Sequence, residues 1–198
     1  MIEKLAYKTA ESFIKSPNSC YDKIEIYQYG FFVLYSNIFF FLITIILGVA
    51  FNALLSSIAL YIAFFSIRQY AGGYHAKTET RCEIISTLSL LACIIVIRLA
   101  KTYEFQTVLL IISAVSALTI FVFCPLDTPE KPLSETEFKY FRKISWLILS
   151  VIIAVIVISF IFKIKMLLVP CCLSLIFENI LIVAGKIKKV SRKNSFKT

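Results

Sequence analysis

The chain alternates long apolar blocks with shorter polar segments, and the lengths of these blocks predict its architecture. Phe31–Ile67 contains no charged residue, and four further blocks follow it: Ile84–Ile97, Val108–Cys124, Trp146–Phe162 and Met166–Gly185. Apolar blocks of about 18 or more residues are typical of membrane-spanning helices, because ~20 residues of helix cross a hydrocarbon core that is ~30 Å thick. The pattern therefore predicts an all-α fold, a polytopic membrane helical bundle.

The first block is about twice as long as one span requires. Two short spans joined by a tight turn near Gly48–Asn52 fit it better than one helix. With this hairpin, one side of the membrane collects most of the Lys and Arg residues, whereas a single span would divide them more evenly. Positive charge favours the cytoplasmic side. We therefore expect six transmembrane helices, with both termini and the loops 68–83 and 125–145 in the cytoplasm.

The segment before the first block predicts an amphipathic helix over residues 1–15. At 100° per residue, one face carries Ile2, Leu5, Ala6, Thr9 and Phe13, and the opposite face carries Lys4, Lys8, Glu11 and Lys15. Such a helix can lie on an anionic membrane surface or pack against the protein's own loops. We expect one membrane domain over 1–198, with an amphipathic cytoplasmic-face segment 1–30, a bundle 31–185 and a basic cytoplasmic tail 186–198.

Composition and charge agree with a membrane protein. Of the 198 residues, 59% are hydrophobic and 17% are charged, whereas about a quarter of the residues in a soluble domain are charged. The net charge of +9 could indicate nucleic-acid binding, but cytoplasmic loops of membrane proteins are basic in any case. We expect no nucleic-acid partner. The six cysteines have no zinc spacing, so we expect free thiols, no metal and no cofactor.

The most unusual stretch of sequence runs from Arg68 to Ala76. It contains the adjacent pair Gly72–Gly73 and His75, the single histidine of the chain, and Cys82 follows seven residues later. One interpretation is a flexible loop between two spans that happens to hold a histidine. The other is a Cys–His pair, in which the histidine is the base that activates a thiol nucleophile.

The geometry around Cys82 sets a condition on the second interpretation. Arg81 and the start of the third span would both favour a thiolate at Cys82. On one continuous helix, however, residues seven apart lie ~10 Å apart along the axis, which is too far for proton transfer. The chain must therefore fold back between His75 and Cys82, and Gly72–Gly73 is the plausible bend.

The run Arg-x-x-x-Gly-Gly-x-His-Ala with its following cysteine resembles the accessory gene regulator protein B family. These proteins are membrane-embedded cysteine endopeptidases that mature quorum-sensing peptides in Gram-positive bacteria. A second segment, Cys124–Leu133, is similar to the Pro-x-Asp-Thr-x-x-Lys-Pro loop of that family, although Glu130 stands where members often have Asn. The chain length, the number of spans and the polar start also fit, so the resemblance covers nearly the whole chain.

The resemblance implies a catalytic dyad with Cys82 as nucleophile and His75 as base. It makes Arg68, Gly72 and Gly73 candidates for shaping the site. On the same predicted face, Asp127 could reach the imidazole or be a turn residue, and Lys131 belongs to a basic loop that suits an acidic substrate.

The substrate that the resemblance implies is a peptide precursor with an amphipathic leader, an inner cysteine and an acidic tail. Cleavage through an acyl-enzyme thioester would be followed by closure of a thiolactone ring. The lipid bilayer is the other expected partner, and a homodimer is compatible with the resemblance. The expected location is a bacterial cell membrane.

Two rival functions remain open at the level of sequence. A membrane transporter or exporter of a small peptide without proteolytic activity needs only the spans, but the chain lacks repeats and paired intramembrane charges. A non-enzymatic sensor partner would use the Gly-Gly-x-His loop as a docking surface. Glu178 and Asn179 lie inside the last apolar block, where polar groups are costly, and they could contact substrate, a partner helix or a lysine.

Overall fold

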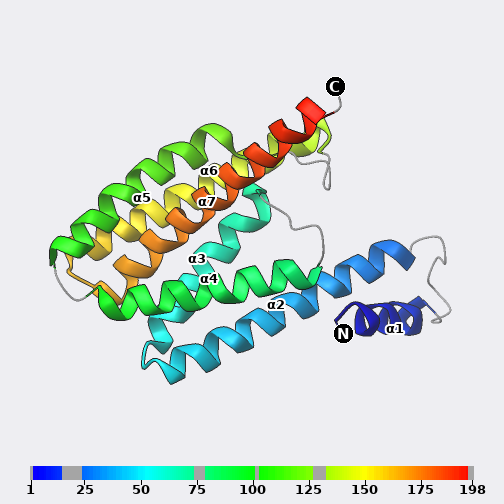
Figure 1. Ribbon diagram of the computed structural model, residues 1–198, viewed down its shortest axis with the longest axis horizontal. Coiled ribbons are helices and arrows are strands. Elements are labelled where there is room, and N and C mark those ends of the chain that lie inside the picture. Colours follow the sequence, from blue (N-terminus) through cyan, green and yellow to red (C-terminus); the bar gives the residue numbers. More distant parts are fainter. Residues whose placement is uncertain (1, 15–23, 74–78, 101–102, 127–132, 196–198) are drawn as a thin grey trace. The chain divides into compact units, whose positions relative to one another are not determined.

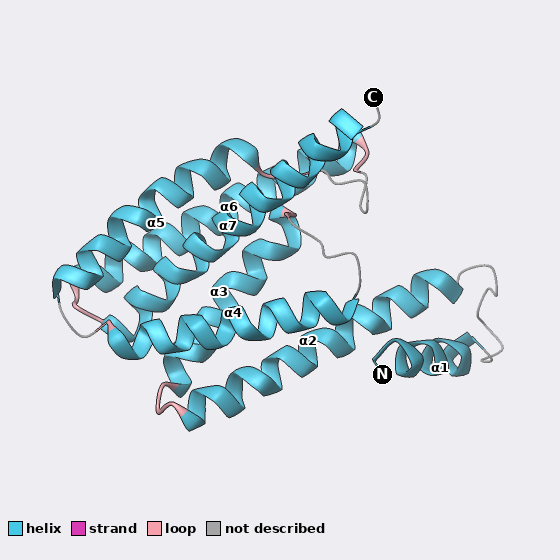
Figure 2. Ribbon diagram, in the orientation of Figure 1, coloured by secondary structure: helices cyan, strands magenta, loops and turns pink. Residues whose placement is uncertain are grey.

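A computed structural model describes residues 2–14, 24–73, 79–100, 103–126 and 133–195 of the chain. These residues form helices and no β-strand (Figure 2). In chain order, the helices are α1 (Ile2–Ile14), α2 (Ile24–Ala50), α3 (Leu54–Ala71), α4 (Glu79–Leu99), α5 (Tyr103–Phe123), α6 (Glu135–Ile161) and α7 (Lys165–Ser195) (Figure 1). The predicted all-α fold is confirmed.

Five of these helices, α2, α3, α5, α6 and α7, are long and apolar enough to cross a membrane. In α4 the apolar stretch is shorter and covers Ile84–Leu99, with Arg98 near its end, within a helix that starts at Glu79 and ends at Leu99. The helix expected for the third span is therefore present and longer than its apolar block, but it is not among the five described helices that are long and apolar enough to cross a membrane. The chain is a multi-pass membrane protein.

The chain divides into two compact units, residues 1–46 and 47–198. In the first unit, α1 packs against the N-terminal half of α2. The hydroxyl groups of Thr9 and Tyr35 lie 2.9 Å apart, and the Phe13 ring lies 5.4 Å from the ring of Tyr27. The predicted amphipathic helix is thus confirmed, and it contacts the protein itself. Leu5 on the same helix is 52% exposed and remains open to other contacts.

The predicted tight turn near Gly48–Asn52 is also confirmed. The amide of Ala53 donates to the carbonyl of Gly48 at 2.8 Å, and Asn52 takes a positive φ of 49°, which Asn tolerates better than most residues. A Cβ on Gly48 would lie 3.0 Å from the Cα of Leu54. The glycine therefore allows the end of α2 and the start of α3 to approach closely.

Helix α7 forms the centre of the second unit. It packs against α3, α5 and α6, and α3 also packs against α6. Every residue from 168 to 175 is buried, and the buried apolar cluster includes Ile67 of α3 and Ile120 of α5. Because α7 is apolar on all sides over this stretch, it is suited to the interior of a bundle.

Two helices, α6 and α7, extend furthest beyond the apolar blocks that predicted them. The block in α6 starts at Trp146, but the helix starts at Glu135, where Ser134 and Glu137 form a reciprocal capping box. The second half of the expected loop 125–145 is therefore helical. The expected basic tail 186–198 is likewise helical as far as Ser195. Lys, Arg and Glu are good helix formers, so a helix need not end where its apolar block ends.

The segments that connect the bundle helices contact one another at the two ends of the bundle. Gly72, directly after α3, forms an isolated parallel backbone bridge with Leu126, which follows α5. At the other end of the bundle, Ser56 near the start of α3 donates to the carbonyl of Met166 near the start of α7 at 3.2 Å. The described start of segment 68–83 and that of segment 125–145 thus lie at one end of the bundle, as the charge count predicted.

Labelling of loops in intact cells tests the orientation that this grouping predicts. A tag inserted in loop 98–105 should react with an impermeant reagent added outside, because this loop carries few cations. A tag in 125–145 should react only after permeabilisation. Protection of the 98–105 tag in cells whose 125–145 tag reacts would place the dyad on the outer face and overturn the orientation.

Candidate functional site

The segment that follows α3 leaves the helix through two glycines. Gly72 has φ 75° and Gly73 has φ 122°, values that residues with a Cβ rarely adopt. The chain therefore turns away from the helix axis directly before the segment that contains His75. The bend that the sequence predicted at Gly72–Gly73 is confirmed.

The first glycine packs directly against the backbone of the second motif. The amide of Leu126 donates to the carbonyl of Ala71 at 2.8 Å, and a Cβ on Gly72 would lie 2.6 Å from the carbonyl oxygen of Leu126. No side chain fits into this contact without a shift of the backbone. The two motifs, more than fifty residues apart in the chain, are thus joined backbone to backbone.

The second glycine packs against α7 and against Arg68. A Cβ on Gly73 would lie 3.3 Å from the carbonyl oxygen of Leu181 and would collide with the guanidinium of Arg68. The absence of a side chain at Gly73 therefore provides the space that the Arg68 guanidinium occupies. Three parts of the bundle, α3, α7 and the segment after α5, contact this glycine pair.

Arg68 lies in the last turn of α3 and connects the loop to α7. Its Nη1 donates a short hydrogen bond to the carbonyl of Gly72 and lies 3.6 Å from Oε1 of Glu178. The Glu178 side chain is fully buried and that of Arg68 is 18% exposed. The sequence left the contact of Glu178 open among substrate, helix and lysine, and the structure gives it a partner on helix α3, an arginine.

The structure describes only part of the predicted site. His75, Asp127 and Lys131 lie outside the described residues. Cys82 is the fourth residue of α4, of which only the backbone is described at this point. Its expected place at the start of the third span is confirmed. Because α3 ends at Ala71 and α4 starts at Glu79, His75 and Cys82 do not share one described helix.

The other described cysteines belong to the packed interior. Cys171 and Cys172 lie in the buried cluster, as their pattern predicted. Cys124 is 2% exposed although it lies two residues before Leu126. Cys93 is half-buried, and all four thiols are free. A buried, free thiol acts as a small hydrophobic side chain, so none of these four resembles an exposed nucleophile.

Cations surround the same end of the bundle. Arg142 of α6 lies over the ring of Trp146, with 4.8 Å from its Cζ to the ring centroid, and that ring stacks on Phe121 at 4.6 Å. Lys186 of α7 lies 3.4 Å from the centroid of Phe123. Aromatic faces attract cations, so the end of α5 holds positive charge close to the segment that contains Leu126.

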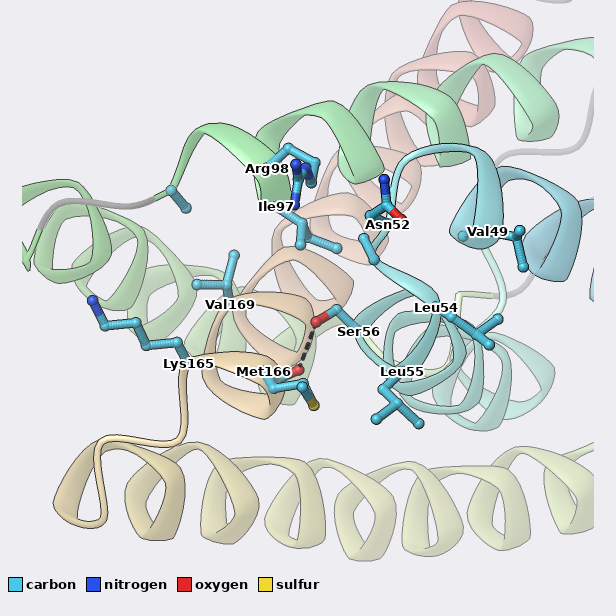
Figure 3. A pocket seen from close by; sticks show the side chains of 13 residues that line it. Val49, Asn52, Leu54, Leu55, Ser56, Ile97, Arg98, Lys165, Met166 and Val169 are labelled. Atoms are coloured by element: carbon cyan, nitrogen blue, oxygen red, sulfur yellow. Dashed lines mark hydrogen bonds between the residues drawn. The ribbon is translucent and has the colours of Figure 1, made fainter.

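A cavity of about 720 Å³ lies at the opposite end of the bundle (Figure 3). It is lined by the turn between α2 and α3, the end of α4 and the start of α7, and it includes Arg98 and Lys165. None of the predicted site residues that the structure describes lines it. This cavity therefore does not lie at the end of the bundle where Gly72 meets Leu126.

Sequence reasoning missed the backbone partners Leu126 and Leu181. The sequence does not show that the backbone of a leucine lies beside a glycine more than fifty residues away, so no sequence signal could have found these two residues. Glu178 was visible as the one acid within the last apolar block. The sequence did not show that Arg68 is the partner of Glu178, because several other cations at this end of the bundle could have paired with it equally well.

Comparison with known proteins shows the family of the chain. The family model described as accessory gene regulator B matches residues 5–183. The chain belongs to the accessory gene regulator B family. No solved structure matches the chain, so the fold described above rests on its own geometry.

Several curated proteins to which the chain is similar are named as accessory gene regulator B or AgrB-like proteins. The chain is 27% identical to putative AgrB-like protein 2 of Clostridium perfringens (strain 13 / Type A), over 81% of this chain and 78% of that protein. It is 26% identical to accessory gene regulator protein B of Staphylococcus intermedius, over 70% of each chain. Protein FsrB of Enterococcus faecalis (strain ATCC 47077 / OG1RF) is 27% identical over 61% of this chain and 50% of that protein.

Replacement of Gly72 by alanine tests the backbone bridge. Gly72→Ala should lower stability by about 1–3 kcal/mol, because its positive φ is strained for alanine and the new Cβ meets the Leu126 carbonyl. Gly30→Ala is the matched control, because no atom lies within 4 Å of a Cβ there. Thermal unfolding in lipid nanodiscs measures both. Equal unfolding temperatures for the two variants would contradict the close contact.

Proposed function

We propose that this protein is a membrane-embedded cysteine endopeptidase that cleaves a quorum-sensing peptide precursor and promotes its cyclisation to a thiolactone. The observation that carries the proposal is the backbone bridge between Gly72 and Leu126. It joins the segment before His75 to the segment before Asp127, and these are the two motifs that resemble the endopeptidase family. A loop with an incidental histidine would not require such an anchor.

The proposed roles follow from residue chemistry. Cys82 is the nucleophile, and its position in the first turn of α4 favours the thiolate because a helix N-terminus carries partial positive charge. His75 is the base, the one imidazole in the chain. Arg68, Gly72 and Gly73 shape the backbone that leads to His75.

In the first step, the Cys82 thiolate attacks the carbonyl carbon of the peptide bond after the signal segment. The C–N bond breaks, the protonated His75 gives its proton to the leaving amine, and the acidic tail departs. The signal segment then remains on Cys82 as a thioester.

In the second step, the thiol of the precursor's own cysteine gives its proton to His75 and attacks the thioester carbonyl. A new C–S bond closes the thiolactone, and Cys82 leaves as thiolate. One thioester replaces another, so the exchange is nearly balanced in energy. The contribution of the protein is to position the inner thiol and to exclude water.

The basic end of the bundle suits the proposed substrate. Lys139 and Lys143 of α6 are exposed, and Arg142 lies between them along the helix. Together with Lys131 they provide positive charge for an acidic precursor tail. In the proposed orientation this end faces the cytoplasm of a bacterial cell, where the precursor is made, and both termini lie on that side.

Cys82 variants test the dyad. Cys82→Ala should abolish cleavage of a precursor peptide by the purified protein in lipid, and His75→Ala should lose nearly as much, because members of a catalytic unit do not contribute additively. Cys93→Ala, Cys171→Ala and Cys172→Ala should retain most activity. A precursor whose inner cysteine is alanine should accumulate on Cys82 as a thioester that hydroxylamine releases. An adduct on another cysteine would refute the assignment.

Ionic strength tests the docking of the tail. Rising salt should raise KM several-fold and change kcat less, because screening weakens the attraction between exposed charges. The matched control is a precursor whose tail acids are replaced by their amides, and its KM should not respond to salt. An equal response of both precursors would mean that the tail is recognised without these charges.

A further inference from the structure

Glu178 is a buried acid for which the proposed reaction has no chemical use. We infer that it is a positioning residue: its carboxylate holds the Arg68 guanidinium against the carbonyl of Gly72, and thereby fixes the backbone that leads to His75. The inference rests on the proposed function and extends it to the interior of α7. Glu178 touches no reacting atom in this scheme and acts through Arg68.

The first step of the argument is the cost of the carboxylate. Glu178 is fully buried in a membrane-spanning helix, and neither carboxylate oxygen has a hydrogen-bond partner among the described residues. A charge in such a place is retained only when it is paired. The ion pair with Nη1 of Arg68, at 3.6 Å, supplies that partner and ties α7 to the last turn of α3.

The second step is that one nitrogen makes both contacts. Nη1 of Arg68 is the atom that faces Glu178 and also the atom that donates to the Gly72 carbonyl. It is also the atom that a Cβ on Gly73 would strike. The backbone of both glycines is thus arranged around a guanidinium, and loss of the carboxylate would remove the buried charge that faces that guanidinium from α7.

The third step concerns the freedom of the loop. Two adjacent glycines have more backbone conformations to lose than any other pair of residues. Their observed conformation therefore needs contacts that outweigh this entropy. The described ones are the bond from Leu126 to Ala71 on one side and the bond from Arg68 to Gly72 on the other. Glu178 faces the guanidinium that makes the second of these hydrogen bonds, the one from Arg68 to Gly72.

The competing explanation is that the ion pair only ties α3 to α7. The two explanations separate because a buried ion pair can often be replaced by apolar residues without loss of stability. In the double variant Arg68→Met with Glu178→Leu, a structural tie would be replaced by apolar packing. A positioning contact would not be, because methionine and leucine cannot donate to the Gly72 carbonyl.

The experiment compares Glu178→Gln, the double variant and a control in the full-length protein in lipid nanodiscs. The control is Gln106→Met, which removes another buried polar contact, the bond from Nε2 to the Ala100 carbonyl at 3.0 Å. Three quantities are measured: the unfolding temperature, the amide hydrogen exchange of the peptide that contains Gly72 and Gly73, and the pH dependence of Cys82 alkylation by iodoacetamide, resolved by mass spectrometry.

In Glu178→Gln, exchange at the glycine pair should rise several-fold, and the midpoint of Cys82 alkylation should move upward to that of His75→Ala. Precursor cleavage should fall by about 100-fold, the scale of a 1 Å misplacement. The double variant should have the unfolding temperature of the wild-type protein. It should keep the raised exchange at the glycine pair and the upward-shifted midpoint of Cys82 alkylation. Gln106→Met should lower the unfolding temperature alone.

Wild-type exchange at the glycine pair in Glu178→Gln would overturn the inference, and so would recovery of loop protection in the double variant. A different result identifies failure of the proposed function. If alkylation of Cys82 in the wild-type protein has the same pH dependence as in His75→Ala, the dyad is wrong, and the catalytic meaning of the contact is refuted with it. Exchange and alkylation thus report on the two proposals separately.

Discussion

Backbone groups that leave a helix beside an apolar bundle must find partners within the protein, and this requirement shapes the end of the molecule where the two motifs meet. In hydrocarbon each unsatisfied N–H or C=O costs several kcal/mol. The carbonyl of Ala71 accepts from Leu126, and that of Gly72 accepts from Arg68. Both contacts need glycine, because a side chain at either position would separate the partners.

The ion pair of Arg68 and Glu178 is not explained by stability alone. Removal of one member of a buried pair typically costs about 3–5 kcal/mol, yet apolar replacement of both is often neutral or favourable. A bundle that needed only cohesion could therefore have used leucine and methionine at these positions. What an apolar pair cannot provide is a donor for the Gly72 carbonyl, which gives the charges a geometric reason to be there.

The sequence was sufficient for the helices and for the place of the turns. Apolar blocks predicted α2 to α7, and the separation of apolar and polar faces in residues 1–15 predicted α1, because burial of apolar surface dominates these choices. It was not sufficient for the helical extensions at Glu135 and Ser195, where no membrane boundary ends the helix. Nor could it pair Glu178 with Arg68, since contacts between distant residues depend on how α3 and α7 pack, which local pattern does not encode.

At the candidate site, too, the sequence shows the chemical groups but not the contacts between distant residues. Residue types made Cys82 and His75 candidates, because a thiol and an imidazole are recognisable wherever they lie, and the family resemblance favoured them. The groups that contact the glycine pair are mostly backbone: the carbonyls of Ala71 and Gly72 and the amide of Leu126 have no signature in the sequence. In a thioester exchange that is nearly balanced in energy, the rate depends on placement of the inner thiol more than on acid or base strength. The contacts that are hardest to find by sequence are therefore the ones that we expect to control this placement.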